Sequence, residues 1–147
     1  MEEIPQKEEK IRKKEEEIRK KEEEIRVVKA RIPQKEEEIR RRQARIDDEG
    51  EKIFQLTIAK GPQEEIEARK SIITLMRDGI QLIENEIERI RDGIQRIEKE
   101  IQWIGQEIQW IQERIRFLQT SQGSFSSFFS FFSFLLFLLF LLFLLPL

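Results

Sequence analysis

Residues 47–51, Asp-Asp-Glu-Gly-Glu, form a concentrated group of side chains that could do chemistry. Carboxylate oxygens are the ligands that calcium and magnesium prefer. An EF-hand loop, however, places its ligands at alternating positions, and this run does not match that spacing. We therefore interpret the run as a solvated helix end and expect no metal site here.

The sequence offers few other groups for catalysis. It contains no His, Cys or Tyr, so most of the usual acid–base, nucleophilic and zinc-binding side chains are missing. The basic run 40–42 has acidic neighbours and no interleaved aromatic residues, and the formal net charge of -2 gives no pull toward nucleic acid. We expect no catalytic residue, no cofactor, no small-molecule substrate and no nucleic-acid partner.

Isoleucines spaced seven residues apart organise the N-terminal half of the chain. They are Ile4, Ile11, Ile18, Ile25, Ile32, Ile39, Ile46 and Ile53. A seven-residue period indicates a helix. The position three residues after each isoleucine is mostly charged, as at Lys14, Lys21 and Lys35, so the apolar stripe is narrow. Pairs of Glu with Lys or Arg four residues later give the helix local support, about 0.2–0.5 kcal/mol each.

From Ile66 onward the pattern has two apolar positions per heptad, a and d, which predicts a coiled-coil seam. The seam residues are Ile66, Ile73, Met76, Ile80, Ile83, Ile87, Ile90, Ile94, Ile97, Ile101, Ile104, Ile108, Ile111, Ile115 and Leu118. Isoleucine at both a and d favours trimers or tetramers over dimers. We therefore expect a homo-oligomer, or pairing with other coiled-coil proteins.

Proline and glycine predict where the rod bends. Pro33 lies inside the isoleucine repeat and is expected to interrupt the helix. Two glycines and a break in the seven-residue phase make 50–61 the predicted hinge. Two arrangements remain open: an extended rod, or a helical hairpin in which the narrow N-terminal stripe covers part of the seam.

Trp103 and Trp110 both fall at position c, one heptad apart, and nominally face outward. Such a pair is consistent with a docking patch for a partner helix. The interpretation that we favour is residual packing in a hairpin or a higher oligomer.

Phenylalanine and leucine dominate the C-terminal segment. From 128 to 145 only Ser130 and Ser133 interrupt them, and the marker residues are Phe128, Phe131, Phe134, Phe137, Phe140, Phe143 and Leu145. A helix of this length is about 27 Å long, near the hydrocarbon thickness of a bilayer. The segment predicts a C-terminal single-pass anchor in a lipid bilayer, with the rod in the cytosol and secretory-pathway membranes favoured. The alternative is a translated simple repeat, because phenylalanine recurs every three residues.

Together these patterns predict an all-α chain of long coiled-coil helices that ends in a transmembrane-type helix. The expected parts are a charged single-stripe repeat, a hinge, an isoleucine coiled coil, a polar linker and a hydrophobic segment, at 1–49, 50–61, 62–119, 120–124 and 125–147.

The order of a coiled coil followed by a hydrophobic tail resembles SNARE proteins and tail-anchored Golgi tethers in arrangement. SNARE helices carry a polar layer near the middle of the seam, whereas here the charged core position, Arg69, lies at its start. The expected function is a membrane-anchored coiled-coil scaffold or tether without catalysis. The alternative is the product of a repeat-derived or young reading frame that self-associates without a selected function.

Overall fold

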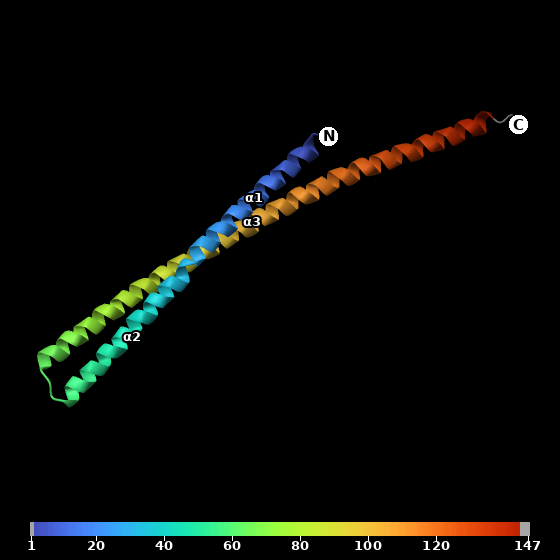
Figure 1. The fold of residues 1–147 in the computed structure, drawn as a ribbon. Coiled ribbons are helices and arrows are strands. Elements are labelled where there is room, and N and C mark those ends of the chain that lie inside the picture. Colours follow the sequence, from blue (N-terminus) through green and yellow to red (C-terminus); the bar gives the residue numbers. More distant parts are fainter. Residues whose placement is uncertain (1, 145–147) are drawn as a thin grey trace. The chain divides into compact units, whose positions relative to one another are not determined.

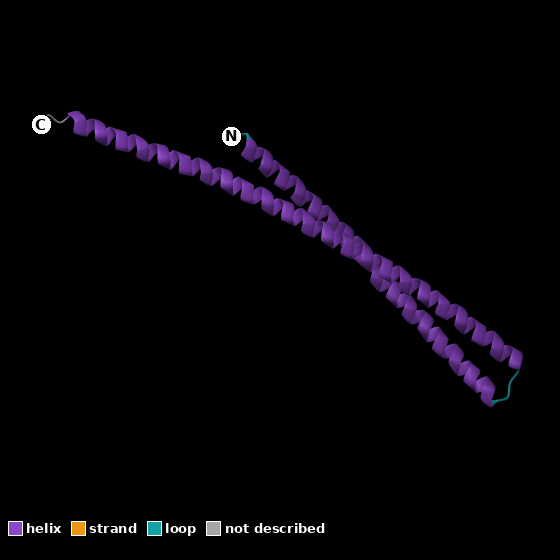
Figure 2. Cartoon of the chain, turned by 180° about the vertical axis from the view of Figure 1, so that it is seen from behind, coloured by secondary structure: helices purple, strands orange, loops and turns teal. Residues whose placement is uncertain are grey.

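The computed structural model describes the backbone of residues 2–144 and the side chains of residues 2–122 and 131–138. Within this part the chain forms three α-helices and no β-strand: α1 (Glu3–Lys29), α2 (Arg31–Ile58) and α3 (Gln63–Leu144) (Figures 1 and 2). The prediction of an all-α chain with long helices is confirmed for these residues. The helices divide into two compact units, residues 1–18 with 102–147 and residues 19–101.

The second unit, residues 19–101, is a helical hairpin. Figure 1 shows α2 and the first part of α3 side by side, joined by a short turn at one end. Ion pairs connect the two antiparallel helices along their length, from Glu49 with Arg69 near the turn to Lys35 with Glu86 farther away. α2 runs through Gly50 without a break, and the chain reverses at residues 59–62.

The boundary between α1 and α2 has its cause in Pro33. Proline has no N–H, and its ring clashes with the carbonyl group four residues earlier. That carbonyl belongs to Lys29, which is the last residue of α1. Ala30 keeps a right-handed helical backbone (φ -63°, ψ -17°). The boundary between the two helices is therefore a local break in the hydrogen bonding, without a change of backbone conformation at Ala30.

The turn between α2 and α3 is a Schellman motif. The N–H of Gly61 donates to the Leu56 carbonyl at 2.8 Å, and the N–H of Lys60 donates to the Thr57 carbonyl at 3.3 Å. Lys60 adopts a left-handed backbone with φ of 51°, at the position where glycine is usual. Pro62 then begins the next helix, because its carbonyl accepts the first α3 hydrogen bonds, from Glu65 and Ile66.

The first unit places the start of α1 beside a more distal part of α3. Lys14 of α1 pairs with Glu107 of α3, and Ile104, Ile108 and Ile115 of α3 are buried. The N-terminal helix is therefore held to α3 by the same combination of isoleucine packing and lysine–glutamate pairing that holds the hairpin.

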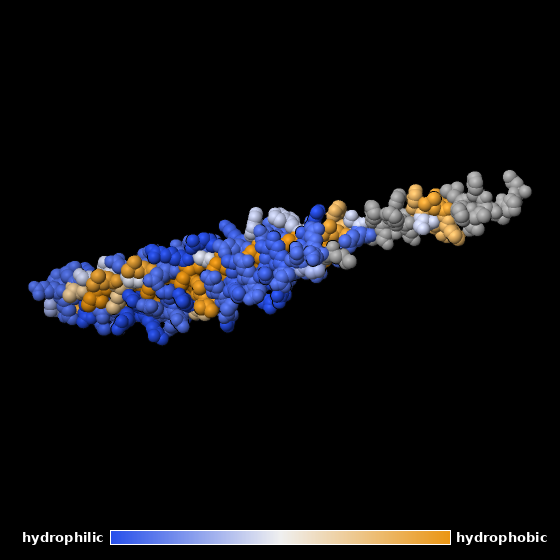
Figure 3. Space-filling model, turned by 90° about the horizontal axis from the view of Figure 1, so that it is seen from above, coloured by the Kyte–Doolittle hydropathy of each residue, from blue (hydrophilic) through white to orange (hydrophobic). Residues whose placement is uncertain are grey.

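The C-terminal part of α3 corrects the membrane prediction. Residues 131–138 are exposed, and Figure 3 shows them as a hydrophobic patch near the C-terminal end.

In the part of the chain that the structure describes, no helix has an apolar stretch long enough to cross a membrane. This finding contradicts the predicted single-pass membrane anchor and its secretory-pathway location. Of the predicted segment, Phe131, Phe134 and Phe137 are exposed. Phe128, Phe140, Phe143 and Leu145 lie outside the described side chains.

Candidate interaction surface

All the predicted seam residues lie on the face of α3 that meets α1 and α2, and none of them is fully exposed. The buried members are Ile66, Ile80, Ile83, Ile87, Ile104, Ile108 and Ile115. The half-buried members are Ile73, Met76, Ile90, Ile94, Ile97, Ile101, Ile111 and Leu118. Whether the seam also pairs between chains stays a prediction. Within one chain, α1 and α2 already cover part of the seam.

A single register describes the ion pairs of both units. Lys14 pairs with Glu107, Lys21 with Glu100 at 2.5 Å, and Lys35 with Glu86, and in each pair the two residue numbers add up to 121. The hairpin register places each isoleucine of the N-terminal stripe level with a d residue of α3, for example Ile39 with Ile83. The narrow stripe therefore lies against the full seam.

The lysines three residues after each isoleucine have a double role in this register. Their side chains are partly covered, with 18–28% of the surface of Lys14, Lys21 and Lys35 exposed. The aliphatic stem of a lysine can cover apolar surface while its ammonium group stays at the edge. Here each ammonium reaches a glutamate at position g of α3. These layers are thus apolar inside and ion-paired at the rim.

The ion pairs change the acidity of the glutamates. The hydrogen bond from Lys35 lowers the pKa of the Glu86 carboxyl below its ordinary value. The hydrogen bond from Lys14 does the same to the pKa of Glu107, with a smaller contribution from the Trp103 indole. Both glutamates therefore stay ionised at neutral pH, as the cross-helix pairs require.

Close to the turn the charges are reversed. Arg69 of α3 occupies a d position and donates to Glu49 of α2 at 2.8 Å and to Glu65 of α3 at 3.1 Å. The hydrogen bond from Arg69 lowers the pKa of Glu49. Lys21 with Glu100 and Lys35 with Glu86 have the base before the turn and the acid after it, whereas this pair, like Glu36 with Arg91 at 3.5 Å, has its acid on α2 and its base on α3.

Exchanging the charges of one pair tests the register. Lys35→Glu is expected to lower the urea midpoint of unfolding, because two carboxylates would then face each other. Glu86→Lys is expected to lower it similarly, and the double variant to regain most of the loss. Circular dichroism at 222 nm measures the midpoint, and the differences should shrink in high salt.

The control for this exchange is Lys99→Glu, which makes the same charge change on an exposed side chain. We expect it to alter the midpoint less than Lys35→Glu does. A double variant no more stable than either single variant would show that Lys35 and Glu86 do not interact.

Two glycines at position g of α3 lie in different surroundings. A Cβ at Gly79 would collide with the guanidinium of Arg42, whereas a Cβ at Gly93 would meet nothing within 4 Å. Gly93→Ala is therefore expected to raise the free energy of unfolding by about 0.5–1 kcal/mol, the usual helix-interior gain. Gly79→Ala should gain less, because Arg42 must move. Equal gains in urea unfolding would contradict this placement of Arg42.

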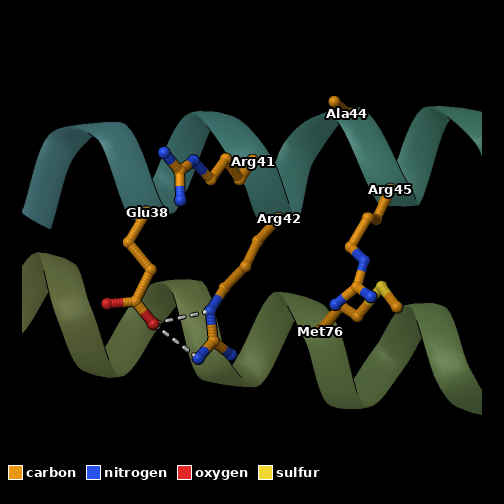
Figure 4. Close-up of a pocket in the computed structure, with 6 residues that line it drawn as sticks. All are labelled: Glu38, Arg41, Arg42, Ala44, Arg45 and Met76. Atoms are coloured by element: carbon orange, nitrogen blue, oxygen red, sulfur yellow. Dashed lines mark hydrogen bonds and ion pairs between the residues drawn. The ribbon is translucent and has the colours of Figure 1, made fainter.

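A surface groove lies between α2 and α3 beside Met76, with a volume of about 590 Å³. Figure 4 shows its lining: Glu38 pairs with Arg42 at 2.7 Å, and Arg45 extends from α2 toward Met76. Its walls are mainly long charged side chains, of which Glu38, Arg41 and Arg45 are exposed. The described residues contain no group of three or more side chains placed to hold a metal ion.

The outward side of α3 carries an aromatic stripe, defined as Trp103, Trp110 and Phe117. The two indole rings meet edge to face with centroids 6.2 Å apart, and the Arg114 guanidinium lies 5.5 Å from the centroid of the Phe117 ring. All three side chains remain 58–60% exposed. The stripe therefore contacts itself and leaves most of its surface uncovered.

Comparisons with known proteins give no relative of this chain. No family model matches the chain, and no curated protein or solved structure matches it either. The functional argument below therefore rests on the contacts within the chain.

The cross-helix ion pairs are the feature that sequence reasoning missed. The sequence suggested local partners for these lysines, such as Glu17 four residues before Lys21, whereas the structure brings Lys21 to Glu100. The signal that would have revealed the pairs is the set of glutamates at position g, Glu86, Glu100 and Glu107. Three lysines meet these three glutamates together only in one antiparallel register.

Proposed function

We propose that the chain is a structural protein, a coiled-coil scaffold that assembles with further copies of itself and has no catalytic role. The observation that carries this proposal is the apolar surface that the paired helices leave uncovered. About half of the seam is only half-buried, and the aromatic stripe lies outside the pairing. Two helices alone cover too little of each other to bury a seam completely.

Further apolar side chains on the outer face of the hairpin support the proposal. Leu75 and Leu82 are 70% and 66% exposed, at the same heptad position as the tryptophans. These leucines and the aromatic stripe are two separate apolar patches, with Arg89 and Arg96 at the same heptad position between them. Exposed apolar patches mark interaction sites, and tryptophan is enriched in protein interfaces. Because covering this surface removes it from water, association of copies is favourable.

Light scattering across a range of concentrations tests the proposal on the full chain. A defined mass that is a small multiple of 17.8 kDa supports a scaffold with a fixed number of copies. A mass of one chain at every concentration rejects it. A continuous distribution of masses also rejects it, because it indicates indiscriminate association of the exposed apolar residues.

Intrinsic fluorescence adds a second readout, since the chain contains two tryptophans, both in the aromatic stripe. If assembly covers the stripe, the emission maximum moves to shorter wavelength as the mass rises. Trp103→Gln and Trp110→Gln, combined in one variant, should then weaken assembly while the helical signal stays. An unchanged mass in this variant would remove the stripe from the interface.

A further inference from the structure

The turn of the hairpin stores strain. Lys60 has a left-handed backbone at the position of the Schellman motif that glycine normally fills, and a lysine pays a steric cost there that glycine does not. The neighbouring Gly61 is crowded, because a Cβ added to it would lie 3.0 Å from the Leu56 Cδ2 atom. The strain exists only as long as the chain reverses at this point.

The interhelical ion pairs of the hairpin all join one side of the turn to the other. Lys21 with Glu100, Lys35 with Glu86, and Glu49 with Arg69 each link a residue before the turn to a residue after it. A second copy can therefore supply either side without changing these pairs. Exchange of identical elements between copies is a low-cost route to a dimer for this reason.

The register gives such an exchange a natural centre. Isoleucines of the N-terminal stripe lie level with d residues when their numbers add up to 122, so residue 61 is the midpoint. In an exchanged pair, Gly61 of the two copies would face each other, and glycine allows close approach of two backbones.

We propose that two copies assemble by exchanging the helices on either side of the turn, so that α2 of one copy pairs with α3 of the other in the register of the hairpin. The inference rests on the proposed self-assembly and specifies how two copies pair through the seam; the aromatic stripe takes no part in the exchange. The partner is a second copy of this chain, and its binding surface is the isoleucine seam with the lysine–glutamate pairs at its rim.

Cysteine cross-linking tests the exchange in a chain that has no cysteine of its own. One preparation carries Lys35→Cys, and a second, enlarged by a tag, carries Glu86→Cys. The two are unfolded, mixed, refolded together and treated with a short thiol-reactive cross-linker. Exchange predicts a product that joins one chain of each kind. A double variant, Lys35→Cys with Glu86→Cys, reports the distance within one chain.

The possible results separate the two proposals. If light scattering finds one chain at every concentration, self-assembly fails and the exchange fails with it. If defined assemblies form but only the double variant cross-links, and within single chains, self-assembly stands and the exchange is rejected. A mixed product that grows with concentration supports both.

Substitution of Lys60 tests the role of strain. Lys60→Gly removes the steric strain from the turn and so stabilises the closed hairpin of each copy. Because strain is then no longer released in either copy on exchange, the association constant should fall roughly tenfold or more. Lys60→Ala keeps a Cβ in that position and removes the charge, and is expected to associate like the unaltered chain. Equal association constants for Lys60→Gly and the unaltered chain would reject turn strain as the driving force.

Discussion

Ile83→Ala is expected to lower the free energy of unfolding by about 2–5 kcal/mol, the range for truncating a buried isoleucine. Ile83 is 7% exposed and lies level with Ile39 across the hairpin. The substitution removes apolar contacts and leaves a cavity between α2 and α3. Because domains of this size are stable by only about 5–15 kcal/mol, the loss is a large share of the total. Urea unfolding followed by circular dichroism measures it.

The neighbouring residue provides the matched control. Leu82 is 66% exposed, so Leu82→Ala removes a side chain of similar size that the hairpin does not bury, and it should change the free energy of unfolding by no more than about 0.5 kcal/mol. Similar losses for both variants below the assembly concentration would mean that the face of α3 assigned to the hairpin is wrong.

The heptad pattern predicted the helices because it depends on local order alone. A seven-residue period requires a helix whatever lies against it, and the apolar face at Ile83 and Ile87 follows from the spacing. The pairing partner does not follow from periodicity. The partner depends on whether and where the chain reverses. Because α2 continues through Gly50 to Ile58, the reversal lies at residues 59–62.

The register is encoded in the sequence, but only as a relation between two distant segments. A slip of one heptad in one direction would leave Lys21, level with Glu107, as the only one of Lys14, Lys21 and Lys35 that meets a glutamate. A slip in the other direction would place Lys35 level with Gly79, which offers no carboxylate. The observed register is the one in which three lysines meet three glutamates. Reasoning from one helix at a time pairs each lysine with a glutamate of its own helix, and so misses this relation.

The C-terminal prediction failed for a different reason. The prediction rested on the phenylalanine and leucine content and on the length of the segment. Among the described residues, no helix is long and apolar enough to cross a bilayer.

Pro33→Ala is expected to raise the free energy of unfolding by about 1–3 kcal/mol, a large part of the cost of a proline inside a helix. The alanine supplies the N–H that the Lys29 carbonyl lacks and removes the ring that separates α1 from α2. The ion pairs on both sides of the break, Lys21 with Glu100 and Lys35 with Glu86, follow one register. A continuous helix is therefore compatible with the contacts already made.

Pro5→Ala is the control, because Pro5 stands in the same Ile-Pro-Gln-Lys-Glu-Glu context and at the same third position of its helix. No helix precedes it within the described residues, so the substitution restores no hydrogen bond to an earlier helix, and the stability should change by less than about 0.5 kcal/mol. Amide hydrogen exchange at residues 30–34 should slow in Pro33→Ala. If exchange there stays fast, or stability falls, the break is needed to fit α1 and α2 onto α3, and Pro33 is a structural requirement of the pairing.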